Sequence, residues 1–264
     1  MILKNEFPKI TVVTPNYNQA KFLELTIQSV LNQNYPNLEY IIIDGGSTDA
    51  SLEIIKKYES KLAYWISEQD NGMYDAINKG FEISTGEIMC WINSDDVLWE
   101  GSLNYIANIF VANTNIRWLQ GFPSVIDEKG DLLFQRNPIN SKYYFYLLKH
   151  EKDFSFIQQE STFWTRDLWE RAGGHLNVNY ALAADFDLWM RFFNFEALYC
   201  TKRQLAAFRK RKGQNSGDYK TYLLEAKKSV DNSFRQLSFF DKFKINISKK
   251  LGIKYGYESI NWID

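Results

Sequence analysis

Short apolar segments alternate with helical patterns over the first hundred residues. The runs at 10–14, 38–43 and 88–92 are rich in β-branched or other apolar residues, which predicts buried strands. Between them, apolar residues recur at helical spacing over 21–32 and 74–84. Short strands separated by helices of about ten residues are typical of a mostly parallel sheet with helices on both faces. We therefore predict an α/β fold with a mostly parallel sheet flanked by helices.

The pattern changes beyond residue 121. Residues 122–134 predict a hairpin around Glu128-Lys129-Gly130, and helical spacing returns over 185–193. From residue 234 onward, five lysines are mixed with the apolar residues Phe239, Phe240, Phe243, Ile245 and Ile247. This amphipathic tail suits docking onto its own domain, a partner or a membrane surface, and docking is the usual explanation.

Polar residues follow three of the predicted strands. Asn16 comes after the first strand, Asp44 after the second, and Asp95 and Asp96 after the strand at 88–92. Because the carboxyl ends of parallel strands meet at one edge of a sheet, we expect these side chains to face one crevice. Two adjacent carboxylates there are costly unless a cation or hydrogen-bond donors neutralise them, and Mg²⁺ or Mn²⁺ suits such oxygen ligands. The alternatives are a helix cap for the pair and a turn residue for Asp44.

Two further segments offer groups for chemistry. Gly72 precedes a predicted helix whose first amide groups suit a phosphate, and Lys79 on that helix adds positive charge, although such a lysine is more often solvated. The segment matches neither the GxGxxG fingerprint nor the phosphate loop that ends in Gly-Lys-Ser/Thr, which argues against those families. Asp185 and Asp187 open an apolar helix, where the helix dipole favours ionised carboxylates. Asp185 is the candidate general base, and helix capping is the alternative for whichever aspartate does not catalyse.

Composition excludes several classes of protein. The 264-residue chain has a formal net charge of −1, so no global field attracts nucleic acid or an acidic lipid surface. Cys90 and Cys200 lie far apart without a CxxC spacing, which argues against a disulfide framework and a zinc site. Residues 1–9 lack the apolar stretch of a signal peptide, and no run reaches transmembrane length. We expect a cytoplasmic protein, and local aromatic and basic patches leave open a peripheral contact at the inner face of the plasma membrane.

Four motifs occur in order along the first two hundred residues: Thr14-Pro15-Asn16-Tyr17-Asn18, Asp44-Gly45-Gly46-Ser47-Thr48-Asp49, Asn93-Ser94-Asp95-Asp96 and Ala184-Asp185-Phe186-Asp187-Leu188-Trp189. Together they resemble those of the family 2 glycosyltransferases, which have the GT-A fold. Four ordered motifs are far less frequent by chance than any single one. The resemblance implies a GT-A domain over 1–215, with a Rossmann-like, nucleotide-sugar-binding half over 8–120, an acceptor half over 121–215, and a helical C-terminal extension over 216–264.

The resemblance also implies roles for individual residues. Asp95 and Asp96 lie at the family's DxD-like motif, where they would hold the Mn²⁺ or Mg²⁺ that bridges to the donor diphosphate. Asp185 matches the family's catalytic base. Pro15, Tyr17 and Asp44 are implied to contact the nucleoside. With the residues argued from the sequence above, the predicted donor-nucleotide site comprises Pro15, Asn16, Tyr17, Asp44, Gly72, Lys79, Asn93, Ser94 and Asp95.

The sequence departs from the family pattern at three places. Ala184 stands where a glutamate often precedes the base, and Asn93 occupies the first DxD position, which shifts the metal role to the two aspartates that follow. Phe-Arg-Lys-Arg at 208–211 replaces a segment that carries a histidine in many members. We expect Arg209 or Arg211 to hold the diphosphate by charge-assisted hydrogen bonds, and the alternative is a basic surface loop.

The segment 158–164 resembles the one that precedes the acceptor region in envelope-polysaccharide glycosyltransferases. It predicts that Gln159 and Glu160 lie near the acceptor and that Trp164 stacks on a sugar face. An aromatic residue in such a segment is more often part of the core, and this alternative stays open.

Together these inferences predict an inverting, metal-dependent glycosyltransferase. It would move a sugar from a nucleotide-diphosphate donor, in the family's commonest case a UDP-sugar, to a glycan or lipid-linked acceptor of a cell-surface polysaccharide. One base and no covalent nucleophile suffice for this route. Two alternatives remain: a non-catalytic nucleotide-sugar-binding module, and a nucleotidyltransferase, whose glycine-rich basic signature the N-terminal region lacks. No nucleic acid partner is expected, and a homodimer is compatible with the sequence.

Overall fold

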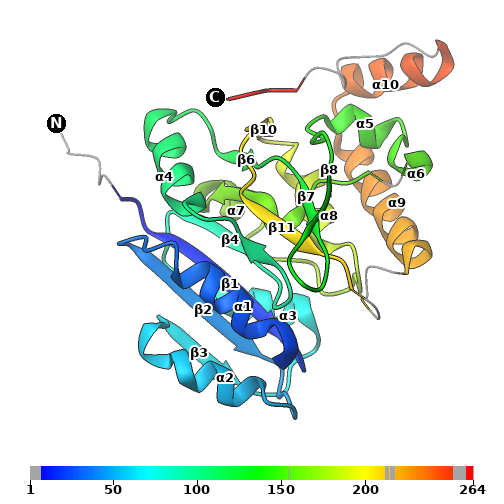
Figure 1. Cartoon of the computed structure of the whole chain (residues 1–264). Helices are drawn as coiled ribbons and strands as arrows, with labels where there is room; N and C mark the ends of the chain where they lie inside the picture. Colours follow the sequence, from blue (N-terminus) through cyan, green and yellow to red (C-terminus); the bar gives the residue numbers. More distant parts are fainter. Residues whose placement is uncertain (1–6, 154, 212–213, 215–217, 252–259, 264) are drawn as a thin grey trace.

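A seven-stranded sheet forms the centre of the molecule (Figure 1). The computed structural model describes residues 7–153, 155–211, 214, 218–251 and 260–263. The strand order is β10-β6-β9-β4-β1-β2-β3, and only β9 runs antiparallel to its neighbours, which confirms a mostly parallel sheet. Its strands are β1 (Ile10–Asn16), β2 (Leu38–Asp44), β3 (Tyr64–Ser67), β4 (Ile88–Trp91), β6 (Trp118–Gln120), β9 (Thr162–Thr165) and β10 (Tyr199–Cys200).

Helices flank this sheet, and those predicted over 21–32 and 74–84 are confirmed to within one residue at each end (Figure 1). Gly80 lets α3 pack directly on β1, because a Cβ atom at this glycine would lie 2.6 Å from Cγ1 of Val13. The helices are α1 (Ala20–Leu31), α2 (Ser51–Tyr58), α3 (Met73–Ile83), α4 (Ser102–Ala112), α5 (Lys142–Tyr146), α6 (His150–Asp153), α7 (Arg166–Arg171), α8 (Ala184–Phe192), α9 (Tyr219–Gln236) and α10 (Phe239–Leu251), with short 3₁₀ turns at Glu59–Lys61 and Gln159–Ser161.

A second, four-stranded sheet has the order β5-β11-β7-β8 and comprises β5 (Val97–Leu98), β11 (Ala206–Arg209), β7 (Ser124–Ile126) and β8 (Leu132–Gln135). The antiparallel pairing of β7 with β8 confirms the predicted hairpin. Its turn is closed by Oδ1 of Asp127, which accepts from the backbone N–H groups of Lys129 and Asp131. Since β11 pairs with β5, which directly follows Asp96, this sheet brings the late segment of the chain beside the Asp95–Asp96 loop.

Four fully buried tryptophans join the central sheet to α8: Trp91 from β4, Trp118 from β6, Trp164 from β9 and Trp189 from α8. The rings of Trp91 and Trp189 stack with centroids 5.9 Å apart, and those of Trp118 and Trp189 with centroids 5.5 Å apart. Trp164 meets Trp91 edge to face at 5.5 Å. This tryptophan cluster holds α8 on the sheet and so fixes the position of Asp185, four residues before Trp189.

The C-terminal segment packs on the rest of the molecule in part. Helix α9 lies against α8 through small buried side chains such as Ala226 and Ser229. Farther along, the backbone N–H of Cys200 donates to the carbonyl of Asn261, and the N–H of Ile263 donates to the carbonyl of Cys200. These bonds add a short segment to the edge of the sheet at β10. The domain boundary expected between residues 215 and 216 lies outside the described residues, as does most of the N-terminal stretch 1–9.

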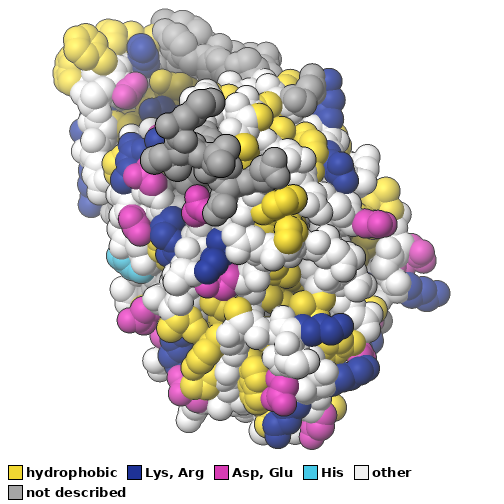
Figure 2. All heavy atoms as spheres, turned by 90° about the vertical axis from the view of Figure 1, so that its left-hand side faces the viewer, with side chains coloured by type: hydrophobic (Ala, Val, Ile, Leu, Met, Phe, Trp, Pro, Cys, Tyr) yellow, Lys and Arg dark blue, Asp and Glu magenta, His cyan; other side chains and the backbone are white. Residues whose placement is uncertain are grey.

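Charged side chains of both signs are mixed on the surface, and the two cysteines are buried. Figure 2 shows basic and acidic side chains interspersed on one face of the molecule, without a large patch of one sign. Cys90 and Cys200 are both buried free thiols. Among the described helices, none is at once long and apolar enough to cross a lipid bilayer.

Candidate active site

The carboxyl ends of β1, β2 and β3 meet around the carboxylate of Asp44. Its Oδ1 accepts from Nδ2 of Asn16 at 2.6 Å and from the hydroxyl of Ser47 at 2.6 Å. Its Oδ2 accepts from the hydroxyl of Ser67 at 2.6 Å and from the backbone N–H of Ser47 at 2.9 Å. Burial alone would raise the pKa of Asp44, but these hydrogen bonds outweigh it and lower the pKa, so the carboxylate is ionised.

The surroundings of Asp44 define what it can do for a nucleoside. Four donors fill the approximate acceptor capacity of a carboxylate. An incoming base or ribose must therefore replace one of them, most simply a serine hydroxyl. On the neighbouring loop Pro15 is buried, whereas the side chain of Tyr17 is 60% exposed and can reach a ligand.

Gly72 and Lys79 are engaged within the protein. The backbone N–H of Gly72 donates to Oδ1 of Asp70 at 2.8 Å, and that of Asn71 donates to Oδ2 of Asp75 at 3.0 Å. The ammonium group of Lys79 pairs with Glu68 at 2.9 Å. Carboxylates thus already occupy the start of α3, and their charge opposes a phosphate. The expectation that Gly72 and Lys79 bind the donor phosphates does not fit this geometry.

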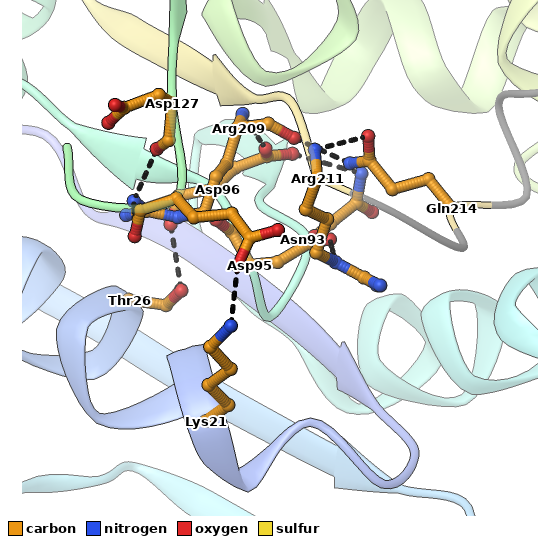
Figure 3. A network of polar contacts seen from close by, with 10 residues as sticks. Lys21, Thr26, Asn93, Asp95, Asp96, Asp127, Arg209, Arg211 and Gln214 are labelled. Carbon is orange, nitrogen blue, oxygen red and sulfur yellow. Dashed lines mark hydrogen bonds and ion pairs between the residues drawn. The ribbon is translucent and has the colours of Figure 1, made fainter. Parts of the chain in front are cut away.

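The loop after β4 is held by Arg209, at the end of β11 (Figure 3). Nε of Arg209 donates to the backbone carbonyl of Asp95 at 2.7 Å, and its backbone N–H donates to Oδ1 of Asp96 at 2.8 Å. Its Nη1 donates to the backbone carbonyl of Asp127 at 3.0 Å. Because Arg209 is only 2% exposed and points its guanidinium at protein oxygens, the expectation that it holds the donor diphosphate is wrong in this structure. Its role is structural.

Asp95 and Asp96 have different environments. Asp96 is fully enclosed, and its Oδ2 accepts from Nδ2 of Asn93 at 3.2 Å. Burial, together with the negative charges of Asp95 and Glu160, raises the pKa of Asp96 well above its usual range. Asp95 retains slight exposure, and its Oδ2 accepts from Nε of Arg211 at 2.6 Å. Asp95 is therefore the aspartate that a ligand can reach.

A divalent cation finds a partial set of ligands here. Within the described part of the chain, no three or more His, Cys, Asp or Glu side chains come together as a metal-binding group. Mg²⁺ and Mn²⁺ need few carboxylates when donor phosphates and water complete the shell. The carboxylate of Asp95 fits this requirement if Arg211 turns to the phosphates, and the buried amide oxygen of Asn93 has no hydrogen-bond partner among the described atoms. Asp96 does not fit this requirement, since protein donors enclose its carboxylate. Ser94, which lies between Asn93 and Asp95 in the sequence, is also buried.

Asp185 lies in the first turn of α8 and faces α9. The hydroxyl of Tyr222, from α9, lies 3.5 and 3.4 Å from the two carboxylate oxygens of Asp185. Burial raises the pKa of Asp185 to about 7, although hydrogen bonds from the backbone of Phe186 and from Tyr222 act in the opposite direction. A carboxylate that titrates near neutral pH is suited to accept a proton from a hydroxyl group.

Glu225, also from α9, caps the loop that leads into α8. Its carboxylate accepts from the backbone N–H groups of Ala181, Leu182 and Ala183 at 2.7, 2.9 and 2.9 Å. The start of a helix ordinarily lowers the pKa of a nearby acid. Glu225 places a negative charge there, which contributes to the raised pKa of Asp185. Tyr222 and Glu225 were not expected from the sequence, because they lie about forty residues from their partners and in no motif.

The segment before β9 lies between these two regions. Glu160 is buried, and burial raises its pKa to about 7, with a smaller contribution from the charge of Asp185. Its own charge raises the pKa of Asp96, so Glu160 links the Asp95–Asp96 loop electrostatically to Asp185. Nε2 of Gln159 donates to the backbone carbonyl of Trp91 at 2.7 Å, which ties the segment to the end of β4.

Trp164 requires a correction. Its indole is fully buried in the tryptophan cluster, where it also contacts the ring of Phe81 at a centroid distance of 5.9 Å. An indole in this position cannot stack on a sugar. The core alternative is the correct one, and it accounts for part of the 16% aromatic content of the chain.

Comparisons with known proteins find similar sequences and similar structures. The family model described as "Glycosyl transferase family 2" matches residues 11–170, which is 160 of 264 residues. A relative named PGL/p-HBAD biosynthesis glycosyltransferase, from Mycobacterium bovis (strain BCG / Pasteur 1173P2), is 27% identical over 209 residues, which cover 72% of each chain.

Solved structures show the same fold. TarS 1-349 from S. aureus, in complex with UDP-GlcNAc, superposes with a TM-score of 0.71 at 17% identity and covers 92% of this chain and 71% of that one. In a longer TarS structure, the match covers 94% of the present chain but only 44% of the TarS chain. The mannosyltransferase PcManGT from Pyrobaculum calidifontis, in complex with GDP-Man and Mn2+, has a TM-score of 0.57 at 15% identity and covers 95% of this chain and 82% of that one.

Proposed function

Because the chain belongs to glycosyl transferase family 2, we propose that it transfers a sugar from a nucleoside diphosphate donor to an acceptor hydroxyl with inversion of configuration. The observation that carries this proposal is Asp185, whose pKa of about 7 suits a base and whose site is linked through Glu160 to the Asp95–Asp96 loop. The UDP-GlcNAc of the TarS structure supports a UDP-sugar as donor. We further propose a glycan or lipid-linked acceptor of a cell-surface polysaccharide, in line with the family resemblance.

The chemistry divides between the two halves of the site. Asp185 accepts the proton of the acceptor hydroxyl as the oxygen attacks the anomeric carbon, and Tyr222 orients the carboxylate. On the donor side, Arg211 releases Asp95 and donates to the departing diphosphate, for which a guanidinium is well matched. Arg209 keeps the loop in place throughout.

Asp95 would hold Mg²⁺ or Mn²⁺ together with the donor diphosphate. When bound, the ion would stabilise the negative charge that develops on the leaving group. The Mn2+ and GDP-Man of the PcManGT structure support a divalent ion, and they leave the choice of nucleotide open.

Thermal unfolding with UDP, GDP and dTDP, each with and without Mn²⁺, tests the donor site. We expect one nucleotide to stabilise the protein in the presence of Mn²⁺, by about 2.7 kcal/mol at a ligand concentration of 100 times Kd, because it binds only the folded state. Asp95→Asn should remove this stabilisation, whereas Asp75→Asn, on the first turn of α3, should retain it. If no nucleotide shifts the melting temperature, the proposal fails.

A non-catalytic nucleotide-sugar-binding module is the second candidate. It is favoured by one observation: Ala184 occupies the place of a glutamate that often precedes the base. Release of free nucleoside diphosphate from the donor identified above distinguishes the enzyme from the binding module, since a binding module would release none.

Glu225→Gln tests how the base is tuned. Removal of the negative charge beside α8 should lower the pKa of Asp185, because Glu225 contributes to raising it. We expect the acidic limb of the kcat/KM profile to move to lower pH by less than about one unit, since burial remains the larger cause. Asp231→Asn removes an exposed charge from the same helix and should leave the limb where it is. A shift to higher pH, or an equal shift in both variants, would contradict the role of Glu225.

A further inference from the structure

Helix α10 presents aromatic side chains to solvent. Phe239 and Phe240 are 77% and 75% exposed, and Phe243 is 55% exposed. Their rings contact one another, with centroids 6.1 Å apart for Phe239 and Phe240 and 6.4 Å apart for Phe239 and Phe243. These three residues form one patch, which we call the α10 aromatic patch. In Figure 1 the helix lies at the periphery, beyond α5.

The opposite side of the same helix packs on the protein. Ile245 and Ser248 are buried. Since successive helical residues are about 100° apart, Ile245 lies roughly 140–160° around α10 from Phe240 and Phe243, which places it on the opposite side of the helix. An ordinary surface helix buries its apolar stripe and exposes its polar one. Docking onto the domain therefore explains Ile245 but leaves the α10 aromatic patch without a role in the fold.

Positive charge surrounds the α10 aromatic patch. The helix carries Lys242, Lys244, Lys249 and Lys250 against a single acid, Asp241, so its net charge is +3 in a chain whose net charge is −1. Asp241 accepts from the hydroxyl of Ser238 at 3.0 Å and acts as part of the helix start. Lys244, Lys249 and Lys250 are exposed and able to extend towards a negatively charged surface.

We propose that α10 docks on the surface of an anionic phospholipid bilayer. The rings of the α10 aromatic patch would enter the boundary between headgroups and acyl chains, and the lysines would contact lipid phosphates. A second copy of the chain is the less suitable occupant, because lysine is depleted in protein interfaces whereas aromatic residues combined with lysines are typical of interfacial helices. The proposal does not rest on glycosyl transfer, and it needs only the exposed face of α10.

Flotation of the full-length protein with vesicles tests the proposal. We expect binding to vesicles of phosphatidylcholine and phosphatidylglycerol in equal parts, weak binding to phosphatidylcholine alone, and loss of binding at high salt. The triple variant Phe239→Ser, Phe240→Ser, Phe243→Ser should bind the anionic vesicles at least about tenfold more weakly, given the apolar area that each ring buries. The matched control replaces three exposed apolar residues elsewhere, Leu25→Ser, Tyr64→Ser and Ile83→Ser, and should bind like the wild type.

Three outcomes would overturn the proposal. The wild type does not float with anionic vesicles, or the triple variant floats as well as the wild type, or the triple variant changes a self-association seen by sedimentation without vesicles, which would assign the patch to a second copy. Release of nucleoside diphosphate from the donor, measured without vesicles, should be equal in the triple variant and the wild type. That measurement tests the proposed function separately.

Discussion

Asp185→Asn is expected to lower the rate of nucleoside diphosphate release by about 10²–10⁴-fold, the range that general base catalysis supplies. The substitution keeps the size of the side chain and one acceptor for Tyr222, but it removes the group that takes the proton. The donor nucleotide should still raise the melting temperature, because Asp185 is proposed to act on the acceptor hydroxyl and not to bind the nucleotide. Turnover at the wild-type rate would remove Asp185 as the base.

The stability of the same variant shows that lost turnover is not lost folding. Unfolded aspartate titrates near 3.8, whereas the pKa of Asp185 in the folded protein is about 7. The folded state thus holds a proton that the unfolded state has released, so the contribution of Asp185 to stability becomes unfavourable as the pH rises from about 4 to 7 and stays unfavourable above that. Asp185→Asn should raise the free energy of unfolding by roughly 2–4 kcal/mol at pH 8 and by little at pH 4.

Asp187→Asn serves as the matched control on α8. Asp187 pairs with Arg191 at 3.0 Å and accepts from Ser229, so its replacement should destabilise the protein mildly at pH 8 and preserve turnover. Equal effects of the two substitutions on turnover would indicate general damage to α8 rather than loss of a base.

Arg209→Met is expected to lower the free energy of unfolding by about 2–5 kcal/mol, because each buried carbonyl group left without its charged donor costs about 1–3 kcal/mol. The methionine fills a similar volume, but the carbonyl groups of Asp95 and Asp127 lose their donor, and the positive charge that interacts with Asp96 is removed. Urea unfolding measures the loss. Donor binding should weaken as well, since the loop that carries Asp95 is no longer held.

Arg203→Met provides the comparison for Arg209. Arg203 is exposed, and it donates to the carbonyl of Glu100 at 3.1 Å and lies over the ring of Tyr105. Its replacement should cost less than about 1 kcal/mol. If both variants lose the same small amount, the enclosed guanidinium of Arg209 is not a structural centre of the site.

The hydrophobic pattern of the sequence predicted the N-terminal part of the fold, up to β4. The alternation of strands and helices up to β4 was correct because each strand there is a short apolar run and each helix has its own stripe. Strand β9 was missed because it enters the sheet between β4 and β6 by antiparallel pairing, which no periodicity signals. Trp164 was assigned to a sugar site for the same reason: its partners in the core come from distant strands and from α8.

The polar motifs that follow β1, β2 and β4 were placed correctly at the ends of strands, but the residues that contact them could not be predicted from the sequence. Arg209 reaches the Asp95–Asp96 loop across more than a hundred residues, and the pairing of β11 with β5 brings it there. Similarly, the sequence places Asp185 at a helix start but does not show that Glu225 would counter the helix dipole. Contacts of this kind depend on packing between elements, which a single sequence does not encode in any local spacing.

The tryptophan cluster gives the protein an internal optical probe. Aromatic rings produce a near-ultraviolet circular dichroism signal only when their surroundings are fixed, whereas the far-ultraviolet signal follows the backbone. Because Trp91 and Trp189 stack across the boundary between β4 and α8, their band depends on the seating of the helix that carries Asp185. A substitution that loosens the packing of α8 on the sheet will weaken the near-ultraviolet band before any helical content is lost. The change can be followed without an added label.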